Sequence, residues 1–303
     1  MRCPLCDCPD NSTIMRDGKP VLQTNFGVAF LECADCGFVF TDFIYQQVLD
    51  YYYTHFCRLE LNADDKAHLQ VQATENAQSQ LDTIRPYLPE NFGKVLDFGG
   101  GSGEAARLYL PYSDEVYITE SDPRSIERIR EGYELKLIED DHLMDDEFVG
   151  FFDLVIFSNV LEHMTYPIKR MGDFSRIIKP GGWLFVEIPN EAEPLKQTGW
   201  HSPQHILFFS PKTFEDLVHR QGSFDIEDLR TCGAPLKEII AAKGLIHAFD
   251  KLQTPDGWVI RSLLKNSRPQ TEIKEVHLDP DDARKTLADL SDYAFRMVNN
   301  HWS

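Results

Sequence analysis

Between residues 94 and 230, short apolar segments alternate with segments that have helical periodicity. Strands that alternate with helices are joined by right-handed crossovers, which produce a mostly parallel sheet. We therefore predict an α/β, Rossmann-like fold with helices on both faces of that sheet. The expected strands are 94–98, 116–119, 135–138, 152–158, 183–189 and 224–230, and the expected helices are 102–110, 123–132, 168–178 and 211–221.

The rest of the chain differs in character from this alternating region. Cysteines punctuate the first 40 residues, polar helical runs such as ADDKAHLQVQATENAQSQLDTI follow, and the last 70 residues look mainly helical. We predict four parts: a cysteine-rich module at 1–44, whose cysteine spacing indicates a zinc-binding module, a helical connector or lid at 45–91, the α/β domain at 92–232 and a helical C-terminal extension at 233–303.

A glycine-rich turn, Gly99-Gly100-Gly101-Ser102-Gly103, joins the first expected strand of this region to its helix. Glycines allow a tight turn and let a ligand lie against bare backbone. The turn also fits the dinucleotide fingerprint GxGxx[G/A], and a tight turn without any ligand remains an alternative. Asp97, just before the glycines, would oppose a pyrophosphate but suits a cationic amino group. Glu120, at the end of the next strand, can accept hydrogen bonds from ribose hydroxyls.

The composition limits the range of partners. The formal net charge is −19, from 30 Lys+Arg against 49 Asp+Glu, and this field would repel a nucleic acid. No segment reaches the ~18 uninterrupted apolar residues that cross a bilayer, and the N-terminus has no apolar signal region. We expect a soluble cytoplasmic protein that acts on a small molecule, without nucleic-acid or membrane partners; the oligomeric state stays open.

Two C-x₂-C pairs, Cys3/Cys6 and Cys33/Cys36, are separated by 26 residues. Two such pairs complete a closed Cys₄ shell around one tetrahedral zinc ion, which would be structural because no position stays open. A small module gains stability from such an ion. Free thiols or redox-active dithiols are the alternative.

A family resemblance adds to these observations. VLDFGGGSG, VYITESDP, FDLVIFSNVLEHMTYP and IIKPGGWLFVEIPN resemble, in order and spacing, the successive motifs of class I S-adenosylmethionine (SAM)-dependent methyltransferases. The resemblance implies that the cofactor is SAM and assigns residues to it. Asp97, Gly99, Gly101 and Gly103 would line its methionine and sugar parts, Glu120 would hold the ribose, Asp140 or Asp141 (we favour Asp141) would reach the adenine, and Asn159 would lie near the sulfonium.

The zinc module together with this domain resembles bacterial sugar C-methyltransferases. Those enzymes carry a Tyr-His-Glu-His-like run after the fifth strand; His205 matches its last histidine, and Gln204 replaces the glutamate. The resemblance makes His205 a candidate base for the acceptor, with His163 of the VLEH motif as a second catalytic candidate. A structural role is an open alternative for each histidine. The large C-terminal domain of those enzymes is absent or much reduced, so the acceptor and the methylated atom stay open.

The function predicted from the sequence is SAM-dependent methylation of a small metabolite, possibly a nucleotide-linked sugar. Two alternatives remain: an NAD(P)-dependent oxidoreductase, and a non-catalytic zinc-ribbon adaptor that keeps a vestigial cofactor fold.

Overall fold

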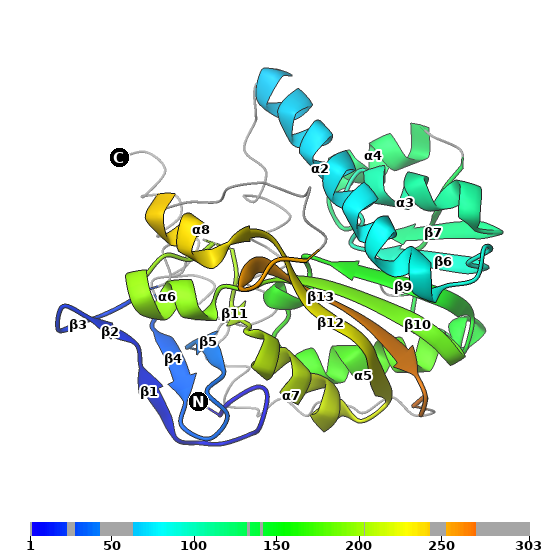
Figure 1. Ribbon diagram of the computed structural model, residues 1–303. Helices are drawn as coiled ribbons and strands as arrows, with labels where there is room; N and C mark the ends of the chain where they lie inside the picture. The colour runs from blue at the N-terminus through cyan, green and yellow to red at the C-terminus, as the bar shows by residue number, and fades with distance from the viewer. Residues whose placement is uncertain are drawn as a thin grey trace.

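A seven-stranded sheet forms the centre of the protein in the computed structural model (Figure 1). The structure describes residues 2–22, 28–42, 63–131, 134–139, 142–202, 204–242 and 253–270. The strand order is β12-β13-β10-β9-β6-β7-β8, and all neighbours are parallel except for β13, which runs antiparallel to β10 and β12. The strands are β6 (Lys94–Phe98), β7 (Glu115–Thr119), β8 (Lys136–Leu137), β9 (Phe152–Ser158), β10 (Ile178–Pro189), β12 (Phe224–Pro235) and β13 (Gly257–Asn266). The predicted mostly parallel, Rossmann-like sheet is confirmed.

Helices cover both faces of this sheet, as Figure 1 shows. On one face lie α2 (Ala63–Ile84), α3 (Glu104–Tyr109) and α4 (Pro123–Glu131); on the other lie α5 (Pro167–Ile177) and α7 (Pro211–Gln221). Strand β9 contributes to both cores because its side chains alternate: Leu154 and Ile156 pack on the first face, Val155 and Phe157 on the second. Each such buried side chain stabilises the fold by about 1.5–3 kcal/mol.

The C-terminal part departs from the prediction. A mainly helical extension was expected from residue 233, and this is wrong for Gly257–Asn266, which forms β13 between β10 and β12. The central sheet therefore continues past residue 232. The segment WVIRSLL has no alternation of apolar and polar residues because β13 is buried on both faces, and Arg261 is 1% exposed. Within the predicted extension, α8 (Leu236–Ala242) is helical, and 271–303 lie outside the described residues.

The N-terminal part is joined to the large domain through a shared sheet. Strands β1 (Asn11–Thr13), β4 (Phe30–Cys33) and β5 (Val39–Thr41) are antiparallel, and β11 (Leu207–Phe208) from the large domain pairs with β5 as the fourth strand. This pairing was not predicted from the sequence. The remaining elements are the hairpin β2 (Met15–Arg16) and β3 (Lys19–Pro20), helix α6 (Ala192–Thr198), and the short 3-10 helices η1 (Arg85–Tyr87), η2 (Leu110–Tyr112), η3 (Asp146–Phe148) and η4 (Leu161–His163).

Helix α2 accounts for the described part of the predicted connector at 45–91. Its Leu81 and Ile84 are buried in the core that α3 and α4 share, so this end of the helix is fixed to the sheet. Tyr51, Tyr52, Tyr53 and His55, in the first part of this connector, lie outside the described residues. In the part of the chain that the structure describes, no helix has the length and apolar character to cross a membrane.

Candidate functional site

The predicted cofactor residues meet at one edge of the sheet. Asp97 lies near the carboxyl end of β6, Glu120 directly follows β7, and Asn159 directly follows β9. Since β6 pairs with both β7 and β9 in parallel, the three strand ends are adjacent. This edge of an open parallel sheet is where such folds bind ligands.

The glycine turn adopts a backbone that side chains resist. Gly99, Gly101 and Gly103 have φ values of 69°, 61° and 84°, and Gly103 is the N-cap of α3. A Cβ on Gly99 would stand 2.9 Å from the side chain of Val160. The backbone N–H of Gly99 donates to the hydroxyl of Thr119 on β7, 3.1 Å away, which fixes the turn to the neighbouring strand. Glycine is therefore required here for both conformation and space.

Asp97 is a buried carboxylate. It is 3% exposed, and among the described residues its Oδ2 has no hydrogen-bond partner. Burial, and next the charge of Glu120, raise its pKa to about 7. A buried carboxylate oxygen without a donor costs free energy that a cationic ligand group would recover.

Glu120 is held at the end of β7 by local hydrogen bonds. Its Oε1 accepts from the backbone N–H groups of Ser121 and Asp122, each at 2.8 Å. These contacts orient the carboxylate beside the glycine turn. The third acidic position, Asp140 or Asp141, lies outside the described residues.

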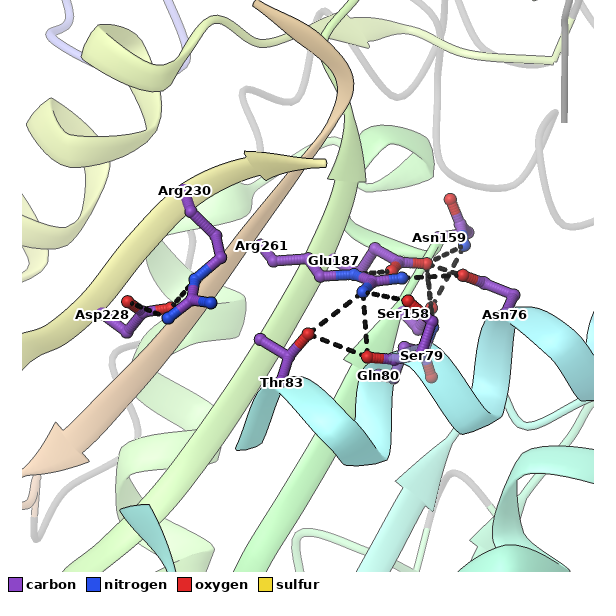
Figure 2. A network of polar contacts seen from close by, with 10 residues as sticks. All are labelled: Asn76, Ser79, Gln80, Thr83, Ser158, Asn159, Glu187, Asp228, Arg230 and Arg261. Carbon is purple, nitrogen blue, oxygen red and sulfur yellow. Dashed lines mark hydrogen bonds and ion pairs between the residues drawn. The ribbon is translucent and has the colours of Figure 1, made fainter. Parts of the chain in front are cut away.

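Asn159 belongs to a polar network around Glu187 of β10, shown in Figure 2. It has a left-handed φ of 54°, and its side-chain amide donates to Glu187 Oε1 at 3.1 Å. Its backbone N–H also donates to the Glu187 carbonyl at 2.8 Å. The site that Asn159 was predicted to serve is thus tied to the next strand of the sheet.

The same network anchors α2 across the sheet. Arg261 of β13 donates to Glu187 Oε2 at 2.6 Å, and each side chain of this pair is 1% exposed (Figure 2). Arg261 also donates to the side chains of Asn76, Ser79 and Thr83 on α2. The attraction of Arg261, together with the amides of Asn76 and Gln80, lowers the pKa of Glu187 despite its burial. A charge pair this buried is stable only with such complete hydrogen bonding.

A second group of ionisable side chains lies beyond the end of β10. His205 is 9% exposed, and its Nδ1 lies 2.6 Å from Oε2 of Glu191, a residue that is 2% exposed. The hydroxyl of Ser202 donates to the other oxygen of Glu191 at 2.5 Å. Burial alone would lower the pKa of His205, but the charge of Glu191, its hydrogen bond and the charge of Glu162 raise it.

Glu162 and His163 of the VLEH motif face this pair. Glu162 Oε1 lies 3.8 Å from Nε2 of His205 and 3.9 Å from Nε2 of His163, and the two rings are edge-on with centroids 4.8 Å apart. Burial raises the pKa of Glu162 to about 7 and lowers that of His163 to about 3. The structure thus brings together the two predicted catalytic histidines and adds two buried glutamates, which we call the acceptor cluster: Glu162, His163, Glu191 and His205.

Backbone hydrogen bonds connect the acceptor cluster to the N-terminal module. The N–H of Ile206 donates to the carbonyl of Glu162 at 3.0 Å, and the carbonyl of Ile206 accepts from the N–H of Thr41 at 2.9 Å. The pairing of β11 with β5 begins at the next residue, Leu207. The module therefore supports the loop before β11, which carries His205.

The four predicted metal ligands also lie together. Sγ of Cys3 is 3.7 Å from that of Cys36, Sγ of Cys6 is 3.4 Å from that of Cys33, and all four sulfurs lie within 4.8 Å of one another. The N–H of Asp7 donates to the carbonyl of Cys3, and the N–H of Gly37 to that of Cys33, so the two turns share one geometry. Both Asp7 and Gly37 have positive φ. Tetrahedral zinc with bonds of about 2.3 Å needs sulfurs about 3.8 Å apart.

Comparison with known proteins identifies the family of the large domain. The family model described as a methyltransferase domain matches residues 69–227, slightly more than half of the chain. The chain belongs to this methyltransferase family. The match confirms the predicted family and supports SAM as the cofactor.

Curated relatives of this methyltransferase act in quinone biosynthesis, according to their names. The ubiquinone/menaquinone biosynthesis C-methyltransferase of Bordetella parapertussis is 29% identical over 133 residues, which cover 41% of this chain and 52% of the relative. The ubiquinone biosynthesis O-methyltransferase of Thiobacillus denitrificans is 27% identical over 133 residues, covering 41% and 56%. The chain spans about half the length of the curated relatives it matches.

Solved structures share the fold of this methyltransferase. A chain from the complex of the Haloferax volcanii Trm112 methyltransferase activator with a methyltransferase superposes with a TM-score of 0.52 at 14% identity, covering 69% of this chain and 97% of that one. A SAM-dependent methyltransferase of Thermotoga maritima gives 0.50 at 16% identity, covering 73% and 100%. At these identities the likeness concerns the fold alone.

Sequence reasoning missed two sets of residues at this edge of the sheet. It named neither Glu191 nor Glu162 as a site residue, although Glu191 comes two residues after β10 and Glu162 precedes a named histidine. It also missed Glu187 and Arg261, which pair from adjacent strands 74 residues apart. The charge in each of the apolar runs WLFVEIP and WVIRSLL was the available signal, because a charge in a fully buried strand requires a partner.

Proposed function

We propose that this protein transfers a methyl group from SAM to a small-molecule acceptor. The observation that carries the proposal is the buried Asp97 carboxylate, whose Oδ2 has no partner among the described residues, directly before a glycine turn and beside Glu120. SAM would supply an activated methyl group. Asp97 would receive the cationic amino group of its methionine part, and Glu120 would hold the ribose hydroxyls.

The same features argue against a dinucleotide as the ligand. A pyrophosphate at the glycine turn would face the carboxyl groups of Asp97 and Glu120. The pKa of Asp97 is already raised by burial and next by the charge of Glu120, so a further negative group there is unfavourable. Asn159 and, outside the described residues, Asp141 complete our proposed cofactor set, near the sulfonium and the adenine. An adaptor that binds no cofactor would have no use for a buried, unsatisfied carboxylate, because that group costs stability.

The acceptor side is the buried acceptor cluster. His205 and His163 remain our candidate catalytic residues, since both lie at the ligand-binding edge of the sheet and His205 is positioned by Glu191 at 2.6 Å. A histidine fixed in this way can act on the proton of an acceptor hydroxyl or carbon acid. The dry surroundings and the alignment of the two substrates would account for the remaining rate enhancement.

The identity of the acceptor is open between two classes. The cysteine module and the His205 run favour a nucleotide-linked sugar, and the names of the curated relatives favour a quinone precursor.

We propose further that Cys3, Cys6, Cys33 and Cys36 bind one structural zinc ion, because four thiolates at this spacing match its tetrahedral shell. Elemental analysis of protein purified without chelators should find one zinc per chain at these cysteines; none would contradict this.

Calorimetry tests the proposed cofactor. The protein should bind S-adenosylhomocysteine (SAH), the product form of SAM, in preference to NAD. Glu120→Ala should weaken the binding of SAH by ~2 kcal/mol, which is the scale of hydrogen bonds to a charged acceptor. Glu127→Ala, an exposed carboxylate on α4, is the matched control and should bind as the parent does. Preference for NAD, or no binding of either ligand, would overturn the proposal, and equal SAH affinity of the Glu120→Ala variant would remove Glu120 from the site.

A further inference from the structure

We propose that Glu162, His163 and His205 bind a divalent transition-metal ion, at a site separate from the four cysteines. The inference deepens the proposed function and rests on it only for the role of the ion, not for the binding itself. Three donor atoms converge from two segments: the short helix η4 carries Glu162 and His163, and the loop before β11 carries His205.

The donor atoms are almost as close together as the ligands of one metal ion. Oε1 of Glu162 lies 3.8 Å from His205 Nε2 and 3.9 Å from His163 Nε2, and one ligand atom from each residue lies within 4.8 Å of the others. A tetrahedral ion with bonds of about 2.05 Å places its ligands about 3.3 Å apart. The two distances from Glu162 would shorten by about 0.5 Å around the ion, which rotations of the three side chains can supply.

Each imidazole is oriented through its other nitrogen. His205 Nδ1 contacts Glu191 Oε2 at 2.6 Å, and Glu191 is itself held by the Ser202 hydroxyl at 2.5 Å. His163 Nδ1 contacts the carbonyl of Gln204 at 3.1 Å. Metal-binding histidines characteristically donate this second N–H to a carboxylate or a backbone carbonyl, which directs the Nε2 lone pair at the ion. Both partners of that arrangement are present here.

The buried carboxylate of Glu162 is the strongest evidence for a metal ion at this site. Its side chain is 1% exposed, and among the described residues neither carboxylate oxygen has a hydrogen-bond partner. Nearly all buried carboxylates are hydrogen-bonded or paired, because an unsatisfied one carries its full desolvation cost. The two imidazole nitrogens at 3.8 and 3.9 Å are too far to satisfy it directly, but an ion between the three residues would.

The donor set selects the class of ion. Two imidazole nitrogens and one carboxylate suit iron(II), manganese, cobalt or zinc. The four thiolates of the cysteine site are softer ligands and would retain zinc. Three protein ligands leave coordination positions open, and the cluster lies at the edge of the sheet where the acceptor is expected. An oxygen atom of the acceptor could occupy one of them, in which case His205 acts on the acceptor through the ion rather than by taking its proton.

Cobalt(II) titration of the full-length, zinc-retaining protein tests the proposal. We expect one Co²⁺ per chain by elemental analysis, in addition to the zinc, with d–d absorption and without the thiolate charge-transfer band of a cysteine site. Glu162→Gln and His205→Asn should abolish this binding, and Glu191→Gln should weaken it by about 10–100-fold, as expected for loss of an outer carboxylate. His142→Asn is the matched control, an exposed histidine 3.2 Å from Asp145, and should leave binding unchanged.

Two outcomes would overturn the proposal: no Co²⁺ beyond the cysteine site, or Glu162→Gln binding Co²⁺ as the parent does while its circular dichroism stays native. Glu191→Gln provides a second measurement should Glu162→Gln fail to fold. SAH affinity, measured on the same samples, separates this inference from the proposed function. Binding of SAH without Co²⁺ rejects the metal site alone, and binding of Co²⁺ without SAH rejects the proposed cofactor alone.

Discussion

The proposed cofactor side and the proposed acceptor side share one edge of the sheet but are built in different ways. On the cofactor side, Asp97, the glycines and Glu120 fall within 24 consecutive residues and end two paired strands. On the acceptor side, the cluster joins η4, the end of β10 and the loop before β11, and the N-terminal module supports that loop. One half of the site depends on a local motif, and the other depends on contacts between distant segments.

The two sides also differ in exposure. On the cofactor side Asp97 is buried, at 3% exposed, while Glu120 is half-buried and Asn159 is exposed. On the acceptor side Glu162, Glu191 and His205 are all buried, at 1%, 2% and 9% exposed. Electrostatic interactions are stronger where water is excluded, so the acceptor side should be more sensitive to single substitutions. Substitutions that affect one side and leave the other intact can test this division.

The largest effect should come from the cysteines. Cys33→Ser should lose the zinc ion and unfold the module, because binding of structural zinc is worth about 10 kcal/mol or more in small domains. Since β5 supports the segment that carries His205, turnover should fall by more than about 10²-fold while SAH affinity stays within a few-fold. Elemental analysis, an acceptor assay and calorimetry measure the three quantities.

Cys8→Ser is the control, because Cys8 is outside the four-cysteine set and should leave one zinc in place. A Cys33→Ser variant with parental turnover, or one that loses SAH affinity as strongly as turnover, would contradict the division between the two sides.

Arg261→Met should lower the free energy of unfolding by about 3–5 kcal/mol, because it leaves Glu187 charged and buried without its cation. Arg230→Met is a matched control on the neighbouring strand: its ion pair with Asp228 is more exposed, at 18% and 14%, and its loss should cost ~1 kcal/mol (Figure 2). Urea unfolding measures both. Similar losses for the two variants would mean that the network does not anchor α2.

His205→Asn should reduce turnover by about 10²–10⁴-fold and leave SAH affinity unchanged, because the substitution removes the imidazole that we propose to act on the acceptor. His219→Asn, an exposed histidine on α7, should retain full turnover. Steady-state kinetics with the true acceptor measure the turnover of both variants. A rate within a few-fold of the parent would leave His205 with a purely structural role.

The smallest effect should be the pH dependence of the cofactor side. Below its pKa of about 7, Asp97 is protonated and cannot pair with an ammonium group, so SAH should bind about tenfold more weakly at pH 6 than at pH 8. Asp97→Asn should bind weakly at both values. Calorimetry over this range is the measurement, and a parental affinity that rises toward pH 6 would contradict the proposed contact.

The raised pKa of the same carboxyl group also predicts how the free energy of unfolding depends on pH. Its pKa is raised in the folded protein from 3.8 to about 7, with Glu120 and Glu104 adding to the effect of burial. Its contribution to folding is therefore fully present below about pH 4 and is lost as the pH rises to 7. Ligand-free Asp97→Asn should lose this component of the pH dependence in urea unfolding.

The elements that alternate regularly could be predicted from the sequence. Strand β9 and helix α7 were predicted with the bounds that the structure has, since a buried parallel strand and a helix between Pro211 and Gly222 leave clear local signals. The cysteine pairs and the glycine turn were found for the same reason: their spacing is local. Strand β13 was missed because it lies beyond the alternating region and its contacts are distant in the sequence: Arg261 pairs with Glu187, 74 residues away.

The sequence by itself determined the alternation of strands and helices from β6 to β12, the glycine turn and the carboxylates at the ends of β6 and β7, because these depend on short-range sterics and on parallel strand ends meeting at one edge. Only the tertiary structure decided that Glu162, His163, Glu191 and His205 share one buried cluster, that Arg261 pairs with Glu187, and that β11 completes the sheet of the module. Those contacts join residues far apart in the chain, and their energy comes from burial and pairing that exist only once the sheet has formed.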